Sequence, residues 1–405
     1  MAIDAHQPGL RIVLYSHDSV GLGHTRRNLA IAHALSAALP ALTGRRVSGL
    51  LITGERTATS YACPEGWDWV VMPGIAKGDA GYTPRTLNVG MSRLMGVRSA
   101  VIDAALRTFR PHVMLVDRHA FGVDGELRGP LERLKSERPQ CQLVLGLRDV
   151  LDAPEVAQRE WAGVGLERVT ALFDQVWVYG DPAVHDGVKA GELPVELIEK
   201  IRFTGYLAQG RQARTTRRLQ ALEPYVVTMA GGGADGFELT ARAAQAPVPT
   251  GYRHLIVTGP QMPAESRAEV RALAGERTEV RTTVPDGLAC LRAASAAVVM
   301  GGYNTVCEAL STGTPTLVVP REVPRTEQLI RARSLHRRGA IDLLRQGEAS
   351  PERLGAWLEA AVVREPAAVR TPREGLDTGG LARVVDYAQN LTSQPHREEL
   401  NRVSA

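Results

Sequence analysis

The chain has 405 residues, a length that favours two or three domains over one. Hydrophobic residues make up 44% and charged residues 23% of the chain, a composition that excludes an intrinsically disordered or fibrous protein. The formal net charge is +4, but the basic residues are spread along the chain and only 5% of residues are aromatic, so we expect no nucleic-acid partner.

No membrane span, secretory signal or metal-binding motif is visible in the sequence. Its apolar runs are far shorter than the roughly 20 residues needed to cross a bilayer, and its first residues lack the basic start and apolar centre of a signal peptide. We therefore expect a cytoplasmic location. The cysteines form no CxxC pair, so we expect no zinc site and no disulfide scaffold: they are Cys63, Cys141, Cys290 and Cys307. We also expect no cofactor.

A strand, a loop and a helix are predicted at the start of the chain. Arg11–Ser16 is a short apolar run typical of a buried strand, and from Thr25 to about Leu39 apolar residues recur at helical spacing. The loop between them contains two glycines. This order is typical of the first unit of a parallel α/β sheet.

The same pattern returns past the middle of the chain. The apolar strand Tyr225–Met229 is followed by the loop Ala230–Gly236 and by a predicted helix over residues 237–246. Further short apolar runs alternate with helical stretches, as in βαβ units of parallel sheets. These runs are Gly49–Thr53, Trp69–Met72, Val113–Asp117, Leu143–Leu147, Gln175–Tyr179, Arg202–Gly205, His254–Thr258, Val280–Val284, Ala296–Met300 and Pro315–Val319. The sequence therefore predicts an α/β protein with two Rossmann-like, doubly wound parallel-sheet domains facing a cleft.

The domain boundaries follow from a polar stretch between the two patterns. Residues 208–223 are Arg-rich and contain no strand pattern, so we interpret them as a linker between an N-terminal domain, 1–207, and a C-terminal domain, 224–378. Residues 379–405 are predicted to form a last helix, over Leu381–Leu391, and a polar tail.

The glycine loop after Tyr225–Met229 is a candidate binding site for a diphosphate. In parallel sheets, ligands bind beyond the carboxyl ends of the strands, where loops lead into helix N-termini. Gly231, Gly232, Gly233 and Ala234 would expose backbone N–H groups at the positive end of a helix dipole. A plain strand-to-helix turn is the alternative interpretation. The absence of a GxxxxGK[ST] pattern disfavours an ATP-hydrolysing P-loop.

The segment Met300–Gln328 carries the most specific motif. Gly302, Asn304 and Thr305 follow a predicted buried strand, and Glu308 comes one turn into the next helix. This segment resembles the nucleotide-sugar signature of the two-Rossmann-domain (GT-B) glycosyltransferases, especially the peptidoglycan UDP-N-acetylglucosaminyltransferases that form lipid II.

The resemblance implies roles for three side chains. Glu308 would hold both ribose hydroxyls of the donor, and a carboxylate that accepts two O–H bonds is also a natural partner for a vicinal diol. Glu327 and Gln328 match a polar pair that contacts the donor sugar in that family. The C-terminal domain would then bind the nucleotide sugar, and the N-terminal domain would bind the acceptor.

The loop from Ser16 to His24 resembles the first glycine loop of the same family. The resemblance implies that Gly21 and Gly23 form an acceptor loop and that His24 has a catalytic or substrate role. A neutral imidazole suits a base that draws a proton from an acceptor hydroxyl, and a helix N-terminus disfavours its protonation. The alternative is that His24 only packs or caps the loop.

Two further strand ends carry charged candidates. Asp117 is a rival base, Asp149 is a group that could orient an acceptor or His24, and Arg148 is assigned to the acceptor site. An ion pair that maintains the fold is the alternative for these loops.

The stretch Arg85–Ile102 combines apolar and basic residues. A helix that covers its own sheet is the favoured interpretation, with contact to a membrane surface as the alternative.

Together these patterns predict a metal-independent glycosyltransferase that moves a sugar from a nucleoside diphosphate donor, with UDP favoured, to an acceptor hydroxyl by inverting single displacement. One alternative is a nucleotide-sugar 2-epimerase or hydrolase on the same fold. The other is a non-catalytic subunit that binds a nucleotide sugar.

Overall fold

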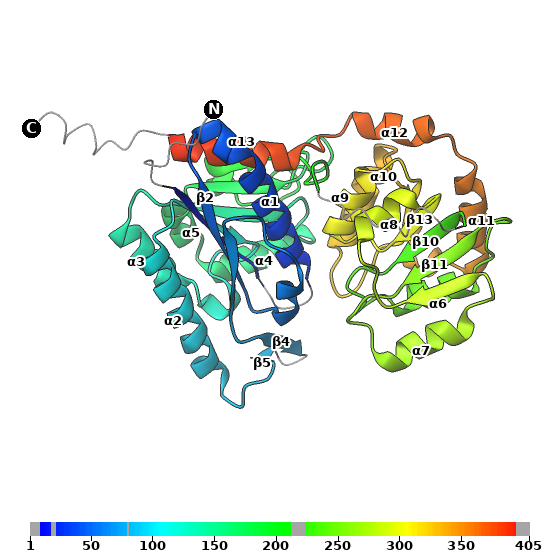
Figure 1. Cartoon of the computed structure of the whole chain (residues 1–405), viewed down its shortest axis with the longest axis horizontal. Coiled ribbons are helices and arrows are strands. Elements are labelled where there is room, and N and C mark those ends of the chain that lie inside the picture. Colours follow the sequence, from blue (N-terminus) through cyan, green and yellow to red (C-terminus); the bar gives the residue numbers. More distant parts are fainter. Residues whose placement is uncertain (1–8, 18–21, 79–80, 212–222, 394–405) are drawn as a thin grey trace, which may run out of the picture.

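Two parallel β-sheets, each covered on both faces by helices, dominate the chain (Figure 1). The computed structural model describes residues 9–17, 22–78, 81–211 and 223–393. The predicted α/β class with two parallel-sheet domains is confirmed. We call the parts built on the first and second sheet the N-terminal lobe and the C-terminal lobe.

The sheet of the N-terminal lobe has seven strands, all parallel. In spatial order they are β3 (Trp67–Val71), β2 (Val47–Thr53), β1 (Leu10–Tyr15), β6 (Val113–Asp117), β7 (Gln142–Arg148), β8 (Gln175–Tyr179) and β9 (Ile201–Phe203). Every residue of β6 is buried, as expected for a central strand with helices on both faces.

Helices cover the two faces of this sheet with separate apolar clusters. One cluster contains α1 (Gly23–Thr43) and α13 (Gly380–Ser393), which pack against each other. The other contains α2 (Met91–Phe109), α3 (Arg128–Glu137), α4 (Pro154–Val164) and α5 (Leu166–Leu172). The C-terminal helix α13 therefore returns to the N-terminal lobe (Figure 1).

The sheet of the C-terminal lobe has six parallel strands. In spatial order they are β12 (Thr278–Arg281), β11 (Arg253–Val257), β10 (Tyr225–Met229), β13 (Ala296–Val299), β14 (Thr316–Val318) and β15 (Asp342–Leu343). One face is covered by α6 (Phe237–Gln245), α7 (Ala264–Leu273) and α11 (Pro351–Val362), and the other by α8 (Gly287–Ala293), α9 (Tyr303–Leu310) and α10 (Glu327–Arg337). Helix α12 (Pro366–Glu374) precedes α13.

Some elements were not predicted. The antiparallel hairpin of β4 (Ile75–Gly78) and β5 (Gly81–Pro84) lacks a sustained apolar run. Short 3₁₀ turns lie at Arg56–Ser60, Val123–Gly125, Val195–Lys200 and Gln346–Glu348.

The first helix is longer than predicted. The prediction ended it at about Leu39, before a proline, whereas α1 continues through Pro40 to Thr43. Pro40 lies in the last turn, and Gly44, with a left-handed φ of 70°, ends the helix by donating its N–H to the Pro40 carbonyl over 3.0 Å.

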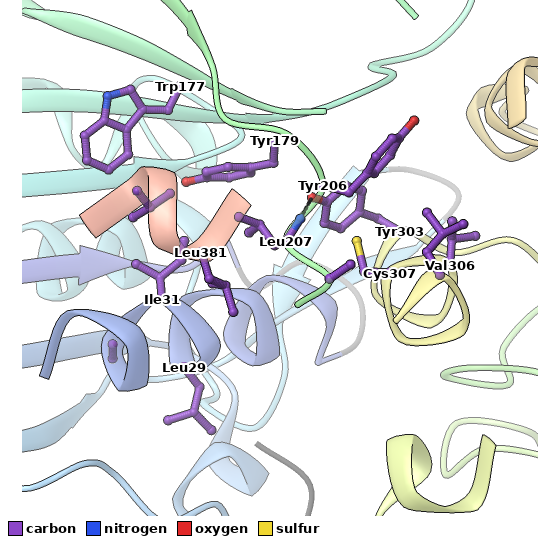
Figure 2. Packing of buried hydrophobic residues seen from close by; sticks show 14 of the residues in the cluster. Leu29, Ile31, Trp177, Tyr179, Tyr206, Leu207, Tyr303, Val306, Cys307 and Leu381 are labelled. Atoms are coloured by element: carbon purple, nitrogen blue, oxygen red, sulfur yellow. Dashed lines mark hydrogen bonds between the residues drawn. The ribbon is translucent and has the colours of Figure 1, made fainter. Parts of the chain in front are cut away.

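The two lobes share one apolar core (Figure 2). Tyr206 and Leu207 lie between Trp177 of β8 and Tyr303 of α9, and the Leu207 N–H donates to the Tyr303 hydroxyl over 3.2 Å. The returning chain runs alongside, because Leu207 forms an isolated bridge with Gly379. The predicted boundaries at 207, 208–223 and 378 stay predictions, and residues 212–222 lie outside the described residues.

The segment Arg85–Ile102 packs mainly against its own lobe. Leu94 and Met95 are buried in a small apolar cluster, and Arg98 is fully buried and paired with Glu126 over 2.5 Å. These contacts favour a helix that covers its own lobe. Among the helices in the described ranges, none is both long and apolar enough to span a bilayer.

Replacing Leu381 tests the docking of α13. Its side chain is 2% exposed in the shared core, so Leu381→Ala should lower the free energy of unfolding by about 2–5 kcal/mol. Chemical denaturation can be followed by the fluorescence of Trp177, which lies 5.9 Å from the Tyr387 ring of α13. Leu42→Ala, at a position 48% exposed, is the control and should shift stability by less than about 0.5 kcal/mol. Equal midpoints for both variants would contradict this packing.

Candidate functional site

Charged side chains at the carboxyl ends of both sheets meet where the lobes touch, a region we call the lobe junction. The N-terminal lobe contributes the start of α1, the loops after β6 and β7, and helix α4, and the C-terminal lobe contributes the first turns of α9 and α10. The contacts across it join Asp149 to Arg331, Glu160 to Arg325, Asp152 to Thr326, Arg26 to Glu308 and Gly23 to Asn304.

His24, in the first turn of α1, hydrogen-bonds to Asp117 at the end of β6. Its Nδ1 atom lies 2.9 Å from Asp117 Oδ2. Arg27 donates to both oxygens of Asp117 over 2.7 and 2.6 Å. Asp117 and Arg27 are 0% and 1% exposed, so each offsets the loss of water around the other. The two residues that the sequence offered as rival bases therefore form one unit.

The charges in this unit decide which group holds a proton. Burial raises the pKa of Asp117, but Arg27 and His24 lower it by more, and the resulting pKa is about 2. The carboxyl group is therefore ionised at neutral pH. Burial lowers the pKa of His24 below 6.5, although Asp117 opposes that shift. A neutral imidazole donates its Nδ1 proton to an adjacent carboxylate, which leaves the Nε2 lone pair free to accept a proton.

Two more histidines lie close to His24. The ring of His17, which follows β1, is centred 5.6 Å from that of His24 and 4.3 Å from that of His119, which follows β6. Burial first, and then neighbouring charged or titratable groups, lowers the pKa of His17 and of His119 well below 6.5. All three imidazoles are therefore neutral at neutral pH.

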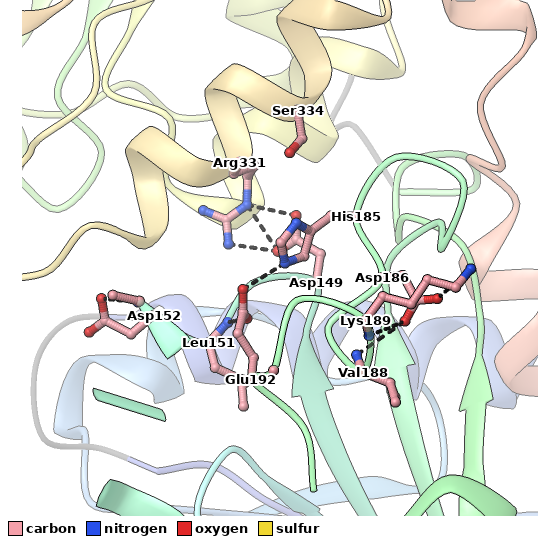
Figure 3. Close-up of polar contacts among 12 residues, drawn as sticks. Asp149, Leu151, Asp152, His185, Asp186, Val188, Lys189, Glu192, Arg331 and Ser334 are labelled. Carbon is pink, nitrogen blue, oxygen red and sulfur yellow. Dashed lines mark hydrogen bonds and ion pairs between the residues drawn. The ribbon is translucent and has the colours of Figure 1, made fainter. Parts of the chain in front are cut away.

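Asp149 follows β7 and is paired with Arg331 of α10 across the lobe junction (Figure 3). Arg331 Nε lies 2.9 and 2.8 Å from the two carboxylate oxygens, and Nη2 lies 2.6 Å from one of them. Arg331 also donates to the Gly301 carbonyl over 3.1 Å. Asp149 thus contacts the C-terminal lobe rather than His24, which favours the interpretation as an ion pair that maintains the fold.

Glu308 of α9 is buried and lies between two arginines. Arg26 of α1 donates to its Oε1 atom, and Arg211 Nη1 lies 3.7 Å from the same oxygen. The other oxygen, Oε2, lies 3.6 Å from the position that a Cβ atom would take at Gly287. The carboxylate predicted to bind ribose is therefore present at the lobe junction, but an arginine of the opposite lobe occupies one of its oxygens.

The first turn of α9 is joined to the start of α1. Asn304 Nδ2 donates to the Gly23 carbonyl over 2.7 Å, and Asn304 Oδ1 accepts from Arg211 over 3.0 Å. Gly302 is the residue before α9, and Thr305 faces the glycine loop, with its hydroxyl 4.0 Å from the Cβ position of Gly231. Gly21 lies outside the described residues.

The glycine loop before α6 combines a packing role with open N–H groups. A Cβ atom at Gly233, where φ is 94°, would lie 2.2 Å from the Thr258 carbonyl oxygen, so close loop packing requires this glycine. Among the described residues, the N–H groups of Gly231, Gly232 and Ala234 donate to no backbone carbonyl. The loop can therefore bind an anion, and packing alone explains only part of its glycine content.

Glu327 and Gln328 converge with the glycine loop on Arg321. Arg321 Nη2 donates to Glu327 over 2.6 Å, its backbone N–H donates to Gln328 Oε1 over 3.1 Å, and Nη1 lies 3.4 Å from Asp235. Glu327 is buried, and its Oε2 atom has no hydrogen-bond partner within the described part of the chain. The structure thus brings together the two segments that were predicted to bind the donor.

Sequence reasoning missed the arginines that pair with the predicted carboxylates. Arg27 was detectable in principle, because it lies three residues after His24 and on the same face of a helix. Arg26, Arg211 and Arg331 reach their partners only through contacts between distant segments. No local pattern reports such contacts.

Breaking the buried pair between the lobes tests its structural role. Asp149→Asn removes the charge that balances Arg331 and should lower the free energy of unfolding by about 3–5 kcal/mol. Glu348→Gln is a matched control, because Glu348 and Arg353 form an exposed pair at 3.9 Å whose loss should change stability by less than about 0.5 kcal/mol. Chemical denaturation measures both, and a loss for Asp149→Asn no larger than that of the control would contradict the assignment.

Comparison with protein families gives one match, in the C-terminal lobe. Residues 226–374 match the family described as Glycosyltransferase family 28 C-terminal domain. No curated protein matches the chain. The match supports glycosyl transfer as the general activity.

Solved glycosyltransferase structures resemble the whole chain. The glycotransferase of kitacinnamycin is 19% identical with a TM-score of 0.61, and the comparison covers 95% of this chain and 100% of that one. Acinetobacter baumannii MurG is 13% identical with a TM-score of 0.57, and Phytolacca americana UGT2, complexed with UDP-2fluoro-glucose and pterostilbene, is 14% identical with a TM-score of 0.64. Both comparisons cover 95% of this chain and 100% of the other. The chain therefore has the two-domain GT-B fold of these glycosyltransferases.

Proposed function

We propose that the chain transfers a sugar from a nucleoside diphosphate sugar, with UDP as the favoured nucleotide, to an acceptor hydroxyl with inversion at the anomeric carbon. The observation that carries this proposal is the His24–Asp117 pair, which lies at the same lobe junction as Glu308 and Glu327. The family match of residues 226–374 and the GT-B fold support it. We also propose that the chain is related to the glycosyltransferases that form lipid II.

The C-terminal lobe would bind the donor. The N–H groups of Gly231, Gly232 and Ala234, at the start of α6, would hold the diphosphate. The ribose hydroxyls would replace Arg26 on the Glu308 carboxylate, and Glu327 with Gln328 would contact the sugar. Binding would therefore exchange an ion pair between the lobes for hydrogen bonds to the donor.

The N-terminal lobe would supply the base. His24 Nε2 would take the proton of the acceptor hydroxyl as its oxygen forms a bond to the anomeric carbon. The bond from that carbon to the diphosphate breaks at the same time, and the diphosphate leaves with the electron pair. Asp117 is a positioning residue, since it fixes the tautomer of His24 and stabilises the imidazolium that forms.

Charge on the departing diphosphate would be stabilised by the protein. The N–H groups of the glycine loop, the N-terminus of α6 and the nearby Arg321 guanidinium all place positive charge there. The proposed mechanism therefore assigns no step to a metal ion. Full activity in the presence of a chelator is expected.

Product analysis separates this proposal from its alternatives. A nucleotide-sugar panel, screened by thermal shift, identifies the donor because a ligand that binds only the folded chain raises the melting temperature. The donor is then incubated with and without a panel of hydroxyl acceptors. Free sugar or an isomer without acceptor would favour a hydrolase or 2-epimerase, and donor binding with no turnover would favour a binding subunit.

Two substitutions test the assignment of Glu308. Glu308→Gln should weaken UDP binding about 10- to 100-fold, because two hydrogen bonds to a charged acceptor are lost. Arg26→Gln should leave UDP affinity unchanged or improve it, because it removes the group that competes for that carboxylate. Isothermal titration calorimetry measures both. An equal loss in the two variants would mean that the ion pair, and not a ribose contact, matters for UDP binding.

Substitution of His24 tests the base. His24→Ala should lower kcat about 10²- to 10⁴-fold and leave UDP affinity unchanged within about threefold. The groups that contact His24 are Asp117, Arg27 and His17, and the charge of Arg148 disfavours its protonation.

The pH profile gives a second readout for this unit. Because burial lowers the pKa of His24, kcat/KM of the native chain should fall only below pH 6.5. Asp117 favours the protonated imidazole, so Asp117→Asn should lower the pKa of His24 and move the acid limb to lower pH, with a reduced kcat. An acid limb at the same pH in both proteins would contradict the coupling of these residues.

A further inference from the structure

Arg148, the last residue of β7, has no carboxylate within ion-pairing distance among the residues that the structure describes. Its buried Nε atom has no hydrogen-bond partner among the residues that the structure describes, and its guanidinium forms no ion pair with any of them. A buried Nε donor without a partner is costly, because water has been removed from that atom and no acceptor replaces it. Such a group is suited to bind an anionic ligand.

The arginines around it are paired, which sets Arg148 apart. Each of five others at the lobe junction has a carboxylate within ion-pairing distance. The pairs are Arg27 with Asp117, Arg118 with Glu160, Arg321 with Glu327, Arg325 with Asp152 and Arg331 with Asp149. Among the described residues of this group, Arg148 is therefore the arginine without a carboxylate within ion-pairing distance.

Strand pairing places Arg148 at the lobe junction. Its strand β7 lies beside β6, which ends at Asp117, the partner of His24, and the next residue, Asp149, pairs with Arg331 of the C-terminal lobe. Burial first, and then repulsion from Arg118, Arg331 and Arg27, lowers the pKa of Arg148 to about 9, against the opposing effect of Glu327. The guanidinium is still charged at neutral pH, and an anion beside it would relieve this repulsion.

A second buried polar atom is unsatisfied on the same side of the N-terminal lobe. His17 is 3% exposed, and its Nδ1 atom has no hydrogen-bond partner in the described part of the chain. Its ring packs against His119, and Arg118 acts on both imidazoles. These imidazoles carry no charge at neutral pH and can donate or accept hydrogen bonds without adding to the local repulsion.

We infer that Arg148 binds an anionic group, a phosphate or a carboxylate, carried by the acceptor. This inference rests on the proposed function, in which the diphosphate of the donor binds the glycine loop of the C-terminal lobe. Arg148 belongs to the lobe that holds His24, so a charge on the acceptor would be fixed close to the base. A planar guanidinium binds the oxygens of either group through two parallel hydrogen bonds. The acceptor class is thus a hydroxyl compound with a negative charge near the reacting oxygen.

The test uses inorganic phosphate and acetate as probes of the full chain. Saturating UDP first fills the donor site, and each probe is then titrated by isothermal titration calorimetry. The native chain should bind at least one probe, and Arg148→Gln should weaken that binding about tenfold or more. Preference for phosphate or for acetate identifies the anionic group. Arg353→Gln, at an exposed position of α11, is the control and should bind like the native chain.

Stability measurements show whether a loss of probe binding in Arg148→Gln is caused by unfolding of the variant. Arg148→Gln removes a charge that has no ion-pair partner, so its melting temperature without ligand should equal or exceed that of the native chain. The rise in melting temperature that the probe causes in the native chain should be absent from the variant.

Three results would overturn the inference. The first is equal probe binding by Arg148→Gln and the native chain, or no binding by either. The second is probe binding by the native chain that occurs without UDP but is lost once UDP fills the donor site, and the third is weakening of UDP binding by more than threefold in Arg148→Gln, since both would assign Arg148 to the donor. If UDP itself fails to bind the native chain, the proposed function fails, and titration without UDP still tests whether Arg148 binds an anion.

Discussion

The arrangement of the lobe junction depends on the pairing of buried charges. Carboxylates and guanidiniums that are removed from water need a partner of opposite charge, and at this junction several partners belong to different lobes. Asp149 accepts from Arg331, and Glu308 accepts from Arg26. Because each pair tolerates little displacement, together they define how the start of α1 faces α9 and α10. Such pairs contribute more to a specific arrangement than to net stability, most of which comes from the shared apolar core.

The parallel sheets explain why these groups meet. All strands of a sheet end at the same edge, so residues far apart in the chain, such as His24 and Asp117, become neighbours. The two lobes then contribute different groups to the proposed reaction. The N-terminal lobe holds a neutral histidine whose tautomer is fixed by an ionised carboxylate, and the C-terminal lobe presents open N–H groups and Glu308 to a nucleotide sugar. The unpaired Arg148 adds a charge that the donor, as proposed, does not use.

The sequence predicted the fold well because its strands are buried on both faces. Runs such as Val113–Asp117 and Tyr225–Met229 are mostly apolar and buried along their length, and glycine loops mark where two of the strands lead into helices. The hairpin β4–β5 was missed because it is short and not buried as a continuous run. The end of α1 was placed too early because the apolar spacing was followed only to about Leu39, whereas Gly44 caps one further turn. For the site, local motifs identified Asp117 and Asp149 as charged groups at strand ends, but their partners, and hence their separate roles, depend on contacts between distant segments. The sequence could not show that Arg148 lacks an ion-pair partner for the same reason, since this depends on which carboxylates from distant segments lie near it.

The most direct measurement is a crystal structure of the chain with UDP bound. Our account predicts that the diphosphate lies within hydrogen-bond distance of the N–H groups of Gly231 to Ala234. It also predicts that the ribose hydroxyls lie on the Glu308 carboxylate, with Arg26 displaced. UDP bound away from the lobe junction, with Glu308 still paired to Arg26, would contradict it.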